Sequence, residues 1–262
     1  MKKHIQENLD AWNTRAKKHI HSAFYDQPSF MAGKSSLKEI ETALLPSLDG
    51  LKVLHLQCHF GQDSLSLARL GAHVTAVDFS QDAINIAKGL SKEMNLPIEF
   101  ICADVLDPML KLEQDFDLVF MSYGVLVWHE DLAPLAELVS RSLSDDGRFL
   151  LVEFHPFMQM YDDATEHLTH SYFQDGPISG VEEGTYADRN DQEEITYTVW
   201  NHSLGEIMNS FIGAGLQVEF FQEYDFSPYP CFNHMIEVGS SRFMVEGKEG
   251  KVPMVFALRA GK

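Results

Sequence analysis

The segment from Val53 to Ser80 constrains the fold of this chain more than any other part of it. A short apolar run, Val53–Gln57, leads into a turn that ends at Gly61. A helical pattern follows, and a second apolar run, His73–Asp78, stops at an acid. Strand, turn, helix, strand and acid form the layout of a nucleotide-binding βαβ unit. The segment therefore predicts a ligand at the carboxyl ends of parallel strands.

The segments that follow continue the alternation of strands and helices. Apolar runs bounded by turn residues predict strands at Ile98–Ala103, Phe116–Met121 and Arg148–Phe154. Helical patterns cover residues 81–90 and 132–143. Alternation at this spacing predicts an α/β fold with a doubly wound parallel sheet.

Both ends of this pattern carry additional segments. We expect residues 1–36 to form an N-terminal helical cap, in which the helix 4–20 has its apolar stripe at Ile5, Leu9, Trp12, Ala16 and Ile20. After strand five the regularity breaks, and residues 155–200 are predicted to form an inserted substrate lid. Its strands are expected at Glu182–Asp191 and Glu194–Trp200. The insertion is too short to bury a core of its own, so residues 1–262 are expected to form a single domain.

The remaining C-terminal segments predict a helix from about residue 204 to Gly213, which Ser203 can cap. Two apolar runs, Leu216–Tyr224 and Val252–Arg259, predict the last two strands.

The composition narrows the class of function. With 39 acidic and 20 basic residues the formal net charge is −19, which disfavours RNA or DNA as partners. The three cysteines are far apart and are expected to be buried, reduced thiols, with no metal site. The N-terminus has no apolar core of a secretory signal, and no run approaches the roughly 20 apolar residues of a membrane span. We therefore expect a cytoplasmic protein.

Two acids at strand ends suggest how a ligand is held. Asp78 follows the first turn by roughly 20 residues, the spacing at which a carboxylate binds both hydroxyls of a ribose. Asp104 ends the third strand at the same edge, where it could accept from an exocyclic adenine amine. Both side chains therefore indicate an adenosine site.

The first turn distinguishes between adenosine-containing cofactors. A dinucleotide needs glycines so that the backbone can approach its pyrophosphate. Here Gln57-Cys58-His59-Phe60-Gly61 holds one glycine. A bulky turn favours a cofactor without pyrophosphate, such as S-adenosylmethionine (SAM).

At this point the motifs resemble those of class I SAM-dependent methyltransferases, over roughly residues 37 to 260. The usual first motif resembles V-L-D-L-G-C-G-x-G, and this chain has V-L-H-L-Q-C-H-F-G at 53–61. His55 stands at the aspartate position, and Gln57 and His59 stand at glycine positions. The segments at 76–80, 102–105, 116–126 and 143–149 resemble the later motifs. The variant of this motif, L-H-L-Q-C-H-x-G-x-D, resembles that of a bacterial subgroup of small-molecule methyltransferases, which are similar to methyltransferase types 11 and 12.

The resemblance implies a Rossmann-like sheet of seven strands in the order 3-2-1-4-5-7-6, with the last strand antiparallel. It also implies SAM as cofactor, S-adenosylhomocysteine as product and a small-molecule acceptor. The predicted cofactor-binding residues are Gln57, His59, Phe60, Gly61, Gln62, Asp78, Phe79, Ser80, Ala103, Asp104, Val105, Ser122, Tyr123 and Gly124.

Acceptor-side residues are predicted by position alone, because methyl transfer mainly needs alignment and exclusion of water. A base is needed only when the acceptor must lose a proton. The candidate bases are His129, His155 and His202. The candidate substrate contacts are Tyr25, Trp128, Tyr186, Arg189 and Trp200.

Two other functions remain open at this stage. One is an NAD-dependent oxidoreductase on the same sheet, which the turn disfavours. The other is a non-catalytic module that binds SAM or a partner.

Overall fold

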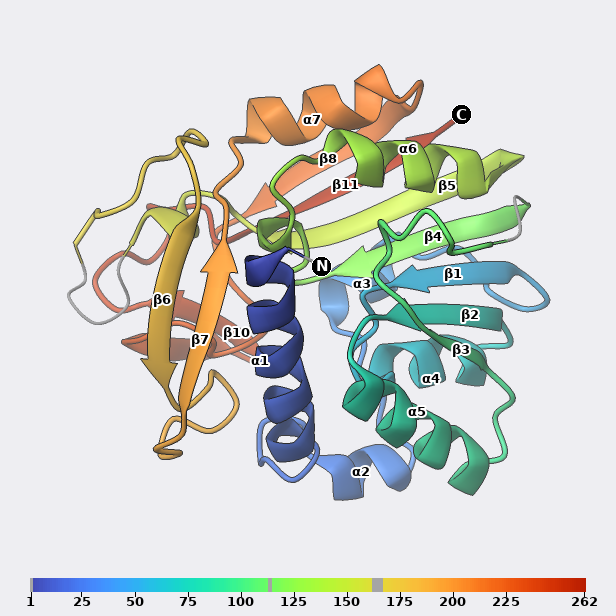
Figure 1. Ribbon diagram of the computed structural model, residues 1–262, viewed down its shortest axis with the longest axis horizontal. Helices are drawn as coiled ribbons and strands as arrows, with labels where there is room; N and C mark the ends of the chain where they lie inside the picture. Colours follow the sequence, from blue (N-terminus) through green and yellow to red (C-terminus); the bar gives the residue numbers. More distant parts are fainter. Residues whose placement is uncertain (1, 113–114, 162–166) are drawn as a thin grey trace.

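The central feature of the protein is a seven-stranded sheet (Figure 1). The structure is a computed structural model that describes residues 2–112, 115–161 and 167–262. The strand order is β3-β2-β1-β4-β5-β11-β8, and β11 is antiparallel to both of its neighbours. This confirms the predicted Rossmann-like sheet and its order 3-2-1-4-5-7-6. The strands are β1 (Lys52–Leu56), β2 (His73–Asp78), β3 (Glu99–Cys102), β4 (Phe116–Ser122), β5 (Leu143–Phe154), β8 (Gln217–Tyr224) and β11 (Val255–Gly261).

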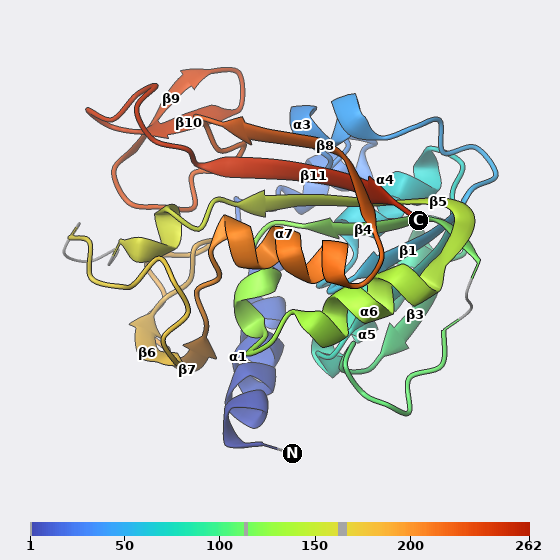
Figure 2. The same ribbon diagram turned by 90° about the horizontal axis from the view of Figure 1, so that it is seen from above.

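Helices cover both faces of this sheet, so its central strands are apolar on both sides. One face packs against α6 and α7, and the other against α3, α4 and α5. Figure 2 shows α6 and α7 on one side and α3 and α4 on the other. These helices are α3 (Glu39–Leu44), α4 (Gln62–Arg69), α5 (Gln81–Glu93), α6 (Ala133–Ser142) and α7 (Leu204–Gly213).

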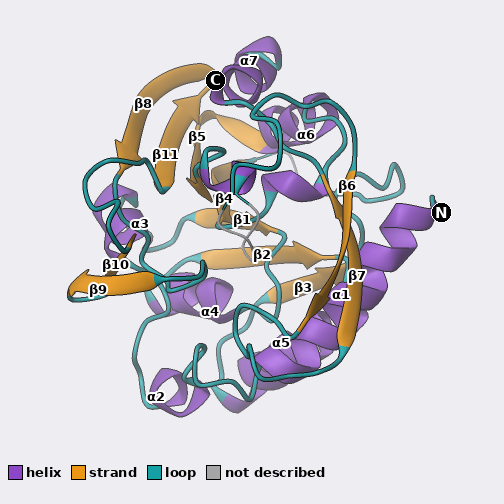
Figure 3. Ribbon diagram, turned by 90° about the vertical axis from the view of Figure 1, so that its left-hand side faces the viewer, coloured by secondary structure: helices purple, strands orange, loops and turns teal. Residues whose placement is uncertain are grey.

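The N-terminal helix and a separate hairpin lie side by side next to the sheet (Figure 3). They are α1 (Lys3–His19) and the antiparallel pair β6 (Ile178–Glu183) and β7 (Glu194–Val199). Asn8 joins them, because its Nδ2 donates to the Thr198 carbonyl at 2.8 Å and its Oδ1 accepts from the Thr198 N–H at 2.9 Å. We call α1 and this hairpin the cover.

Several predicted details of the cover and the termini were wrong. The first hairpin strand ends at Glu183, earlier than predicted, because Gly184 turns the chain with a φ of +77°. The N-terminal cap also contains a short helix beyond the predicted helix 4–20, α2 (Gln27–Met31). Residues 162–166 of the predicted lid lie outside the described residues.

Two further features differ from the sequence-based picture. A second hairpin, β9 (Met235–Gly239) and β10 (Arg242–Val245), lies in a segment for which no strands were predicted. No disulfide joins the three cysteines, but only Cys58 is buried, and Cys102 is exposed at the end of an edge strand.

Gly61 provides a test of the packing below the first turn. Its φ is +79°, and an added Cβ would lie 2.8 Å from the Phe100 ring and 3.1 Å from the Ala87 side chain. We expect Gly61→Ala to lower the free energy of unfolding by about 1–3 kcal/mol, from backbone strain and overpacking. Urea denaturation measures this change.

A matched control is available in α5. Gly89 lies within that helix and has open space around its Cα, so Gly89→Ala should stabilise the protein by about 0.5–1 kcal/mol. Equal effects of the two substitutions would contradict the packing role of Gly61.

Candidate functional site

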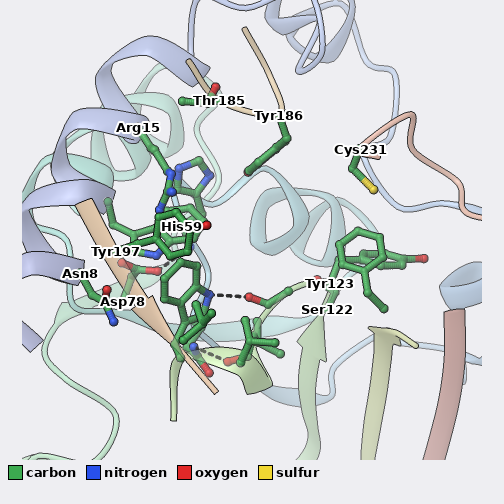
Figure 4. A pocket seen from close by; sticks show the side chains of 18 of the residues that line it. Asn8, Arg15, His59, Asp78, Ser122, Tyr123, Thr185, Tyr186, Tyr197 and Cys231 are labelled. Atoms are coloured by element: carbon green, nitrogen blue, oxygen red, sulfur yellow. Dashed lines mark hydrogen bonds between the residues drawn. The ribbon is translucent and has the colours of Figure 1, made fainter. Parts of the chain in front are cut away.

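A cavity of about 1070 Å³ lies at the carboxyl ends of β1, β2 and β4, below the cover. Strands, loops and cover all contribute to its walls, as Figure 4 shows for labelled residues such as Arg15, His59, Asp78 and Tyr186. The cavity is lined by all of the predicted cofactor residues except Ser80 and Ala103. The lining members are Gln57, His59, Phe60, Gly61, Gln62, Asp78, Phe79, Asp104, Val105, Ser122, Tyr123 and Gly124.

The first turn keeps a glycine-like backbone without the glycines. Gln57 has a φ of 55° and His59 a φ of 52°, both in the left-handed region that glycine adopts most easily. Side-chain contacts hold Gln57 in place, since its Nε2 donates to the Val125 carbonyl at 3.1 Å and its Oε1 lies 3.1 Å from Nε2 of His129. The turn after β1 is thereby tied to the loop after β4.

Asp78 fixes the other side of this turn. Its side chain is 7% exposed, and its oxygens accept from the backbone N–H groups of His59 at 2.8 Å and Ser80 at 2.9 Å. Burial raises the pKa of Asp78 to about 6, against the opposing effect of these donors. Each oxygen retains a lone pair for a further donor, so the carboxylate can still bind two hydroxyls.

Three other predicted cofactor residues lie at the same edge of the sheet, and only one of them lines the cavity. Asp104 lines the cavity, and its Oδ1 accepts from the Leu106 N–H at 2.9 Å. Ser80 lies behind the lining, where it caps α5 and donates to Asn13 of α1. Ala103 also lies behind it, with its N–H donating to the Asp78 carbonyl. Ser80 and Ala103 were predicted as cofactor contacts but support the site from below.

A second buried carboxylate, Glu153, organises the loop after β4. It accepts backbone N–H groups from Gly124, Val125 at 2.8 Å, Leu126 at 3.0 Å and Phe154 at 2.6 Å. Burial raises the pKa of Glu153, although these four donors oppose the rise. The loop that carries Tyr123 and Gly124 into the cavity is therefore held by β5.

Two neutral side chains, His55 and Gln62, anchor α4. His55 stands at the position where the first motif of the resembled family has an acid. His55 is buried, its Nδ1 lies 2.7 Å from the Ser64 hydroxyl, and burial lowers its pKa to about 4. Gln62 donates to the Tyr25 carbonyl at 3.1 Å and to Gln27 Oε1 at 2.8 Å. The first helix after β1 is thus joined to the segment that follows α1.

Of the three predicted histidine bases, His129 alone lines the cavity. Burial and the nearby His202 lower its pKa to about 4, so it is neutral at physiological pH. In His155, Nε2 lies 2.9 Å from Glu223 and Nδ1 accepts from the Phe157 N–H. In His202, Nδ1 lies 2.8 Å from Glu206 and Nε2 lies 2.8 Å from the His129 carbonyl. Both rings have both nitrogens engaged and lie outside the cavity lining, so the structure does not bring these two predicted bases into the cavity.

Four of the five predicted substrate residues line the cavity. They are Tyr25, Trp128, Tyr186 and Arg189. The hydroxyls of Tyr25 and Tyr186 lie 2.6 Å apart, which joins the N-terminal segment to the loop between the hairpin strands. The fifth, Trp200, is buried outside the lining and packs edge-on against His4.

Sequence reasoning missed the polar face of α1. The buried residues of this helix are Asn8, Ala11, Arg15, Ala16 and His19, whereas Ile5, Leu9, Trp12 and Ile20 of the predicted apolar stripe are half-buried. Asn8, Arg15 and His19 recur at helical spacing, and this periodicity of polar residues could have signalled a face turned toward a polar site.

It also missed Glu41, which lies behind the cavity lining and contacts the predicted cofactor residue Tyr123. Glu41 is buried, accepts from the Tyr123 hydroxyl at 2.8 Å, and has its pKa raised to about 7 by burial and by the charge of Asp63. Asp63 in turn accepts from the Ser122 hydroxyl at 3.1 Å.

Comparison with known proteins adds independent information about this region. The family model described as a methyltransferase domain matches residues 53–147, which contain the first turn, Asp78, Asp104 and the loop after β4.

The chain is similar to phosphoethanolamine N-methyltransferase 1 of Triticum aestivum, with 32% identity over 43% of this chain and 24% of that protein. It is also similar to malonyl-[acyl-carrier protein] O-methyltransferase of Bacillus anthracis, with 31% identity over 45% of each chain. The chain thus spans less than half the length of these curated relatives.

Among solved structures, an S-adenosylmethionine-dependent methyltransferase from Mesorhizobium loti superposes with a TM-score of 0.58 at 20% identity. The superposition covers 88% of this chain and 100% of the Mesorhizobium loti chain. Residues 53–147 therefore match the methyltransferase-domain family, and the chain has the Rossmann-like fold of the SAM-dependent methyltransferases.

Proposed function

We propose that this protein binds SAM in the cavity and transfers its methyl group to a small-molecule acceptor. The observation that carries the proposal is the buried carboxylate of Asp78, which lies beside a left-handed first turn in a cavity walled by the matched family segment. When bound, SAM supplies a methyl group on a positively charged sulfur.

The residues present fit this cofactor. Asp78 would accept the ribose hydroxyls, and Asp104 would accept from the adenine amine. The backbone of residues 57–61 would hold the methionine end, because its turn keeps the conformation that glycines usually provide. We further propose that the chain belongs to the bacterial subgroup with the L-H-L-Q-C-H-x-G-x-D first motif.

The cavity walls supply what methyl transfer requires of a protein. The aromatic side chains of Trp12, Tyr25, Trp128 and Tyr186 line the space below the cover. With both ligands bound, these apolar rings would help to exclude water from the reacting atoms. Of the candidate bases, we retain His129, which is neutral and lies beside Gln57. It would be used only for an acceptor that loses a proton.

The enclosure favours a small acceptor over a polymer. The negative charge of −19 also disfavours nucleic acid as a substrate. Two of the matched relatives are named as an N-methyltransferase and an O-methyltransferase, so the proposal covers both kinds of acceptor atom. Among the described residues no helix has the length and apolarity to cross a membrane. We propose a cytoplasmic location.

A dinucleotide cofactor fits this site less well. The side chains of Gln57 and His59 project from the positions where a pyrophosphate needs bare backbone. The proposal therefore favours a methyltransferase over an NAD-dependent oxidoreductase.

Calorimetric titration tests the choice of cofactor. We expect saturable heat with SAM and none with NAD. Asp78→Ala should weaken SAM binding by about 1–3 kcal/mol, because a charged acceptor for two hydroxyls is lost.

Asp107→Ala is the matched control, since Asp107 lies at the same edge but outside the cavity lining. Its affinity for SAM should equal that of the wild type. Tight NAD binding without SAM heat would overturn the proposal.

The pKa of Asp78 gives a second expectation. A carboxylate accepts ribose hydroxyls better than a neutral acid does, so SAM affinity should be highest above about pH 7 and fall as the pH drops through about 6. Asp78→Asn should bind more weakly near neutral pH and lose this step.

Calorimetry between about pH 5 and pH 8 measures both effects. A step that persists unchanged in Asp78→Asn would belong to another group, such as Glu41.

Transfer of a labelled methyl group separates an enzyme from a binding module. Incubation with methyl-labelled SAM and a small-molecule extract should move label into an extractable product. Asp78→Ala should reduce the rate at limiting SAM, and Asp107→Ala should not. SAM binding without transfer to any fraction would favour the non-catalytic module.

A further inference from the structure

Arg15 is an unusual residue in this cavity. It lies on α1, is only 4% exposed and contributes to the cavity lining. Its Nη2 donates to Glu182 of β6, but Nε and Nη1 have no hydrogen-bond partner among the described residues. Buried N–H groups without acceptors cost free energy, and the cost is larger for a charged group. The side chain therefore lacks an acceptor that a ligand could supply.

Aromatic rings surround the guanidinium without meeting this need. Its carbon lies 5.1 Å from the Trp12 ring centroid, 5.6 Å from that of Trp128 and 6.0 Å from that of Tyr197. Such rings attract a cation through their faces. They cannot replace an oxyanion bound to the in-plane N–H groups.

Two more unpartnered nitrogens lie near Arg15. Nε2 of His59 and Nδ1 of His19 are buried without a hydrogen-bond partner among the described residues, and the two rings are 5.3 Å apart. Figure 4 shows Arg15 and His59 facing the same part of the cavity. Burial lowers the pKa of both histidines, so each is neutral and can donate from one ring nitrogen. Arg15 and His59 thus bring open donors to the same cavity, while His19 lies behind its lining.

Lys2 and Lys34, two of the four other cations that line the cavity, are paired with carboxylates at the surface. Lys2 pairs with Glu130 at 2.9 Å, and Lys34 pairs with Asp26 at 3.1 Å, with all four side chains exposed. Glu182, the partner of Arg15, is itself partly exposed and occupies only one of its nitrogens. In a strongly acidic protein, Arg15 is therefore a buried position suited to an anion.

We infer that Arg15 and His59 form the recognition site for an oxyanion, a carboxylate or a phosphate, on the methyl acceptor. This inference rests on the proposed function. The acceptor is favoured over the cofactor because Arg15 contacts the hairpin and Trp128, which are the elements assigned to the acceptor side. A planar guanidinium with two open donors matches either oxyanion.

Tryptophan fluorescence provides the test, because Trp12 and Trp128 are two of the three tryptophans and both contact Arg15. The full chain, saturated with S-adenosylhomocysteine, is titrated with benzoate and with phenyl phosphate. Benzyl alcohol is the neutral probe. We expect a saturable change with at least one anion and none with the alcohol. The stronger anion identifies the oxyanion.

Three variants make the test specific. Arg15→Gln should weaken anion binding by about tenfold or more. Lys17→Gln removes the same charge from the exposed side of the same helix and should leave it unchanged. Glu182→Gln removes the competing carboxylate and should strengthen anion binding, a result that a merely structural Arg15 would not give.

The outcomes separate the inference from the proposed function. Absence of saturable anion binding, or equal losses in Arg15→Gln and Lys17→Gln, would overturn the inference while calorimetric binding of S-adenosylhomocysteine upholds the function. If Arg15→Gln instead weakens S-adenosylhomocysteine and the anions bind only in its absence, Arg15 serves the cofactor carboxylate and the inference fails. Arg15-dependent anion binding by a protein that binds no S-adenosylhomocysteine would uphold the anion site and overturn the function.

Discussion

The hydrogen bond from the His59 backbone N–H to Asp78 is the contact on which the ligand-binding edge depends. It joins the end of β2 to the turn after β1 and fixes that turn where Gln57 and His59 adopt left-handed backbone angles. Such angles cost a non-glycine residue on the order of 1 kcal/mol or more. The contacts of the Gln57 side chain with the loop after β4 help to offset this cost. The turn therefore keeps the backbone conformation of a glycine-containing turn and also carries the polar side chains of Gln57 and His59.

Much of the sheet could be predicted from the sequence because its signals are local. Strands buried on both faces produce continuous apolar runs, and the acid at Asp78 and the cap at Ser203 mark element ends. β2 therefore ends at Asp78 and α7 begins after Ser203, as predicted. That residues near Asp78 line one cavity could be predicted for the same reason, since strand ends in a parallel sheet share one edge.

The rest depended on contacts between distant segments. Arg15 pairs with a carboxylate 167 residues away, and Asn8 pairs with backbone 190 residues away. No local pattern reveals such partners, so α1 was assigned an ordinary apolar stripe. Trp200 and His202 were placed in the cavity by sequence proximity, but packing against His4 and Glu206 draws them elsewhere. A side chain's direction at a loop end is set by tertiary packing.

The attachment of α1 at two places has a consequence for how molecules enter and leave. Asn8 binds the hairpin, while Asn13 accepts from the Ser80 hydroxyl and the Asp82 N–H at the start of α5, directly after Asp78. Opening the cover at that end must therefore break contacts with the start of α5, the helix that begins shortly after Asp78. Under the proposed function, the cofactor and the methyl acceptor would then enter and leave through the same opening movement of the cover. In such an arrangement turnover is governed by how often that step occurs, rather than by the reaction inside.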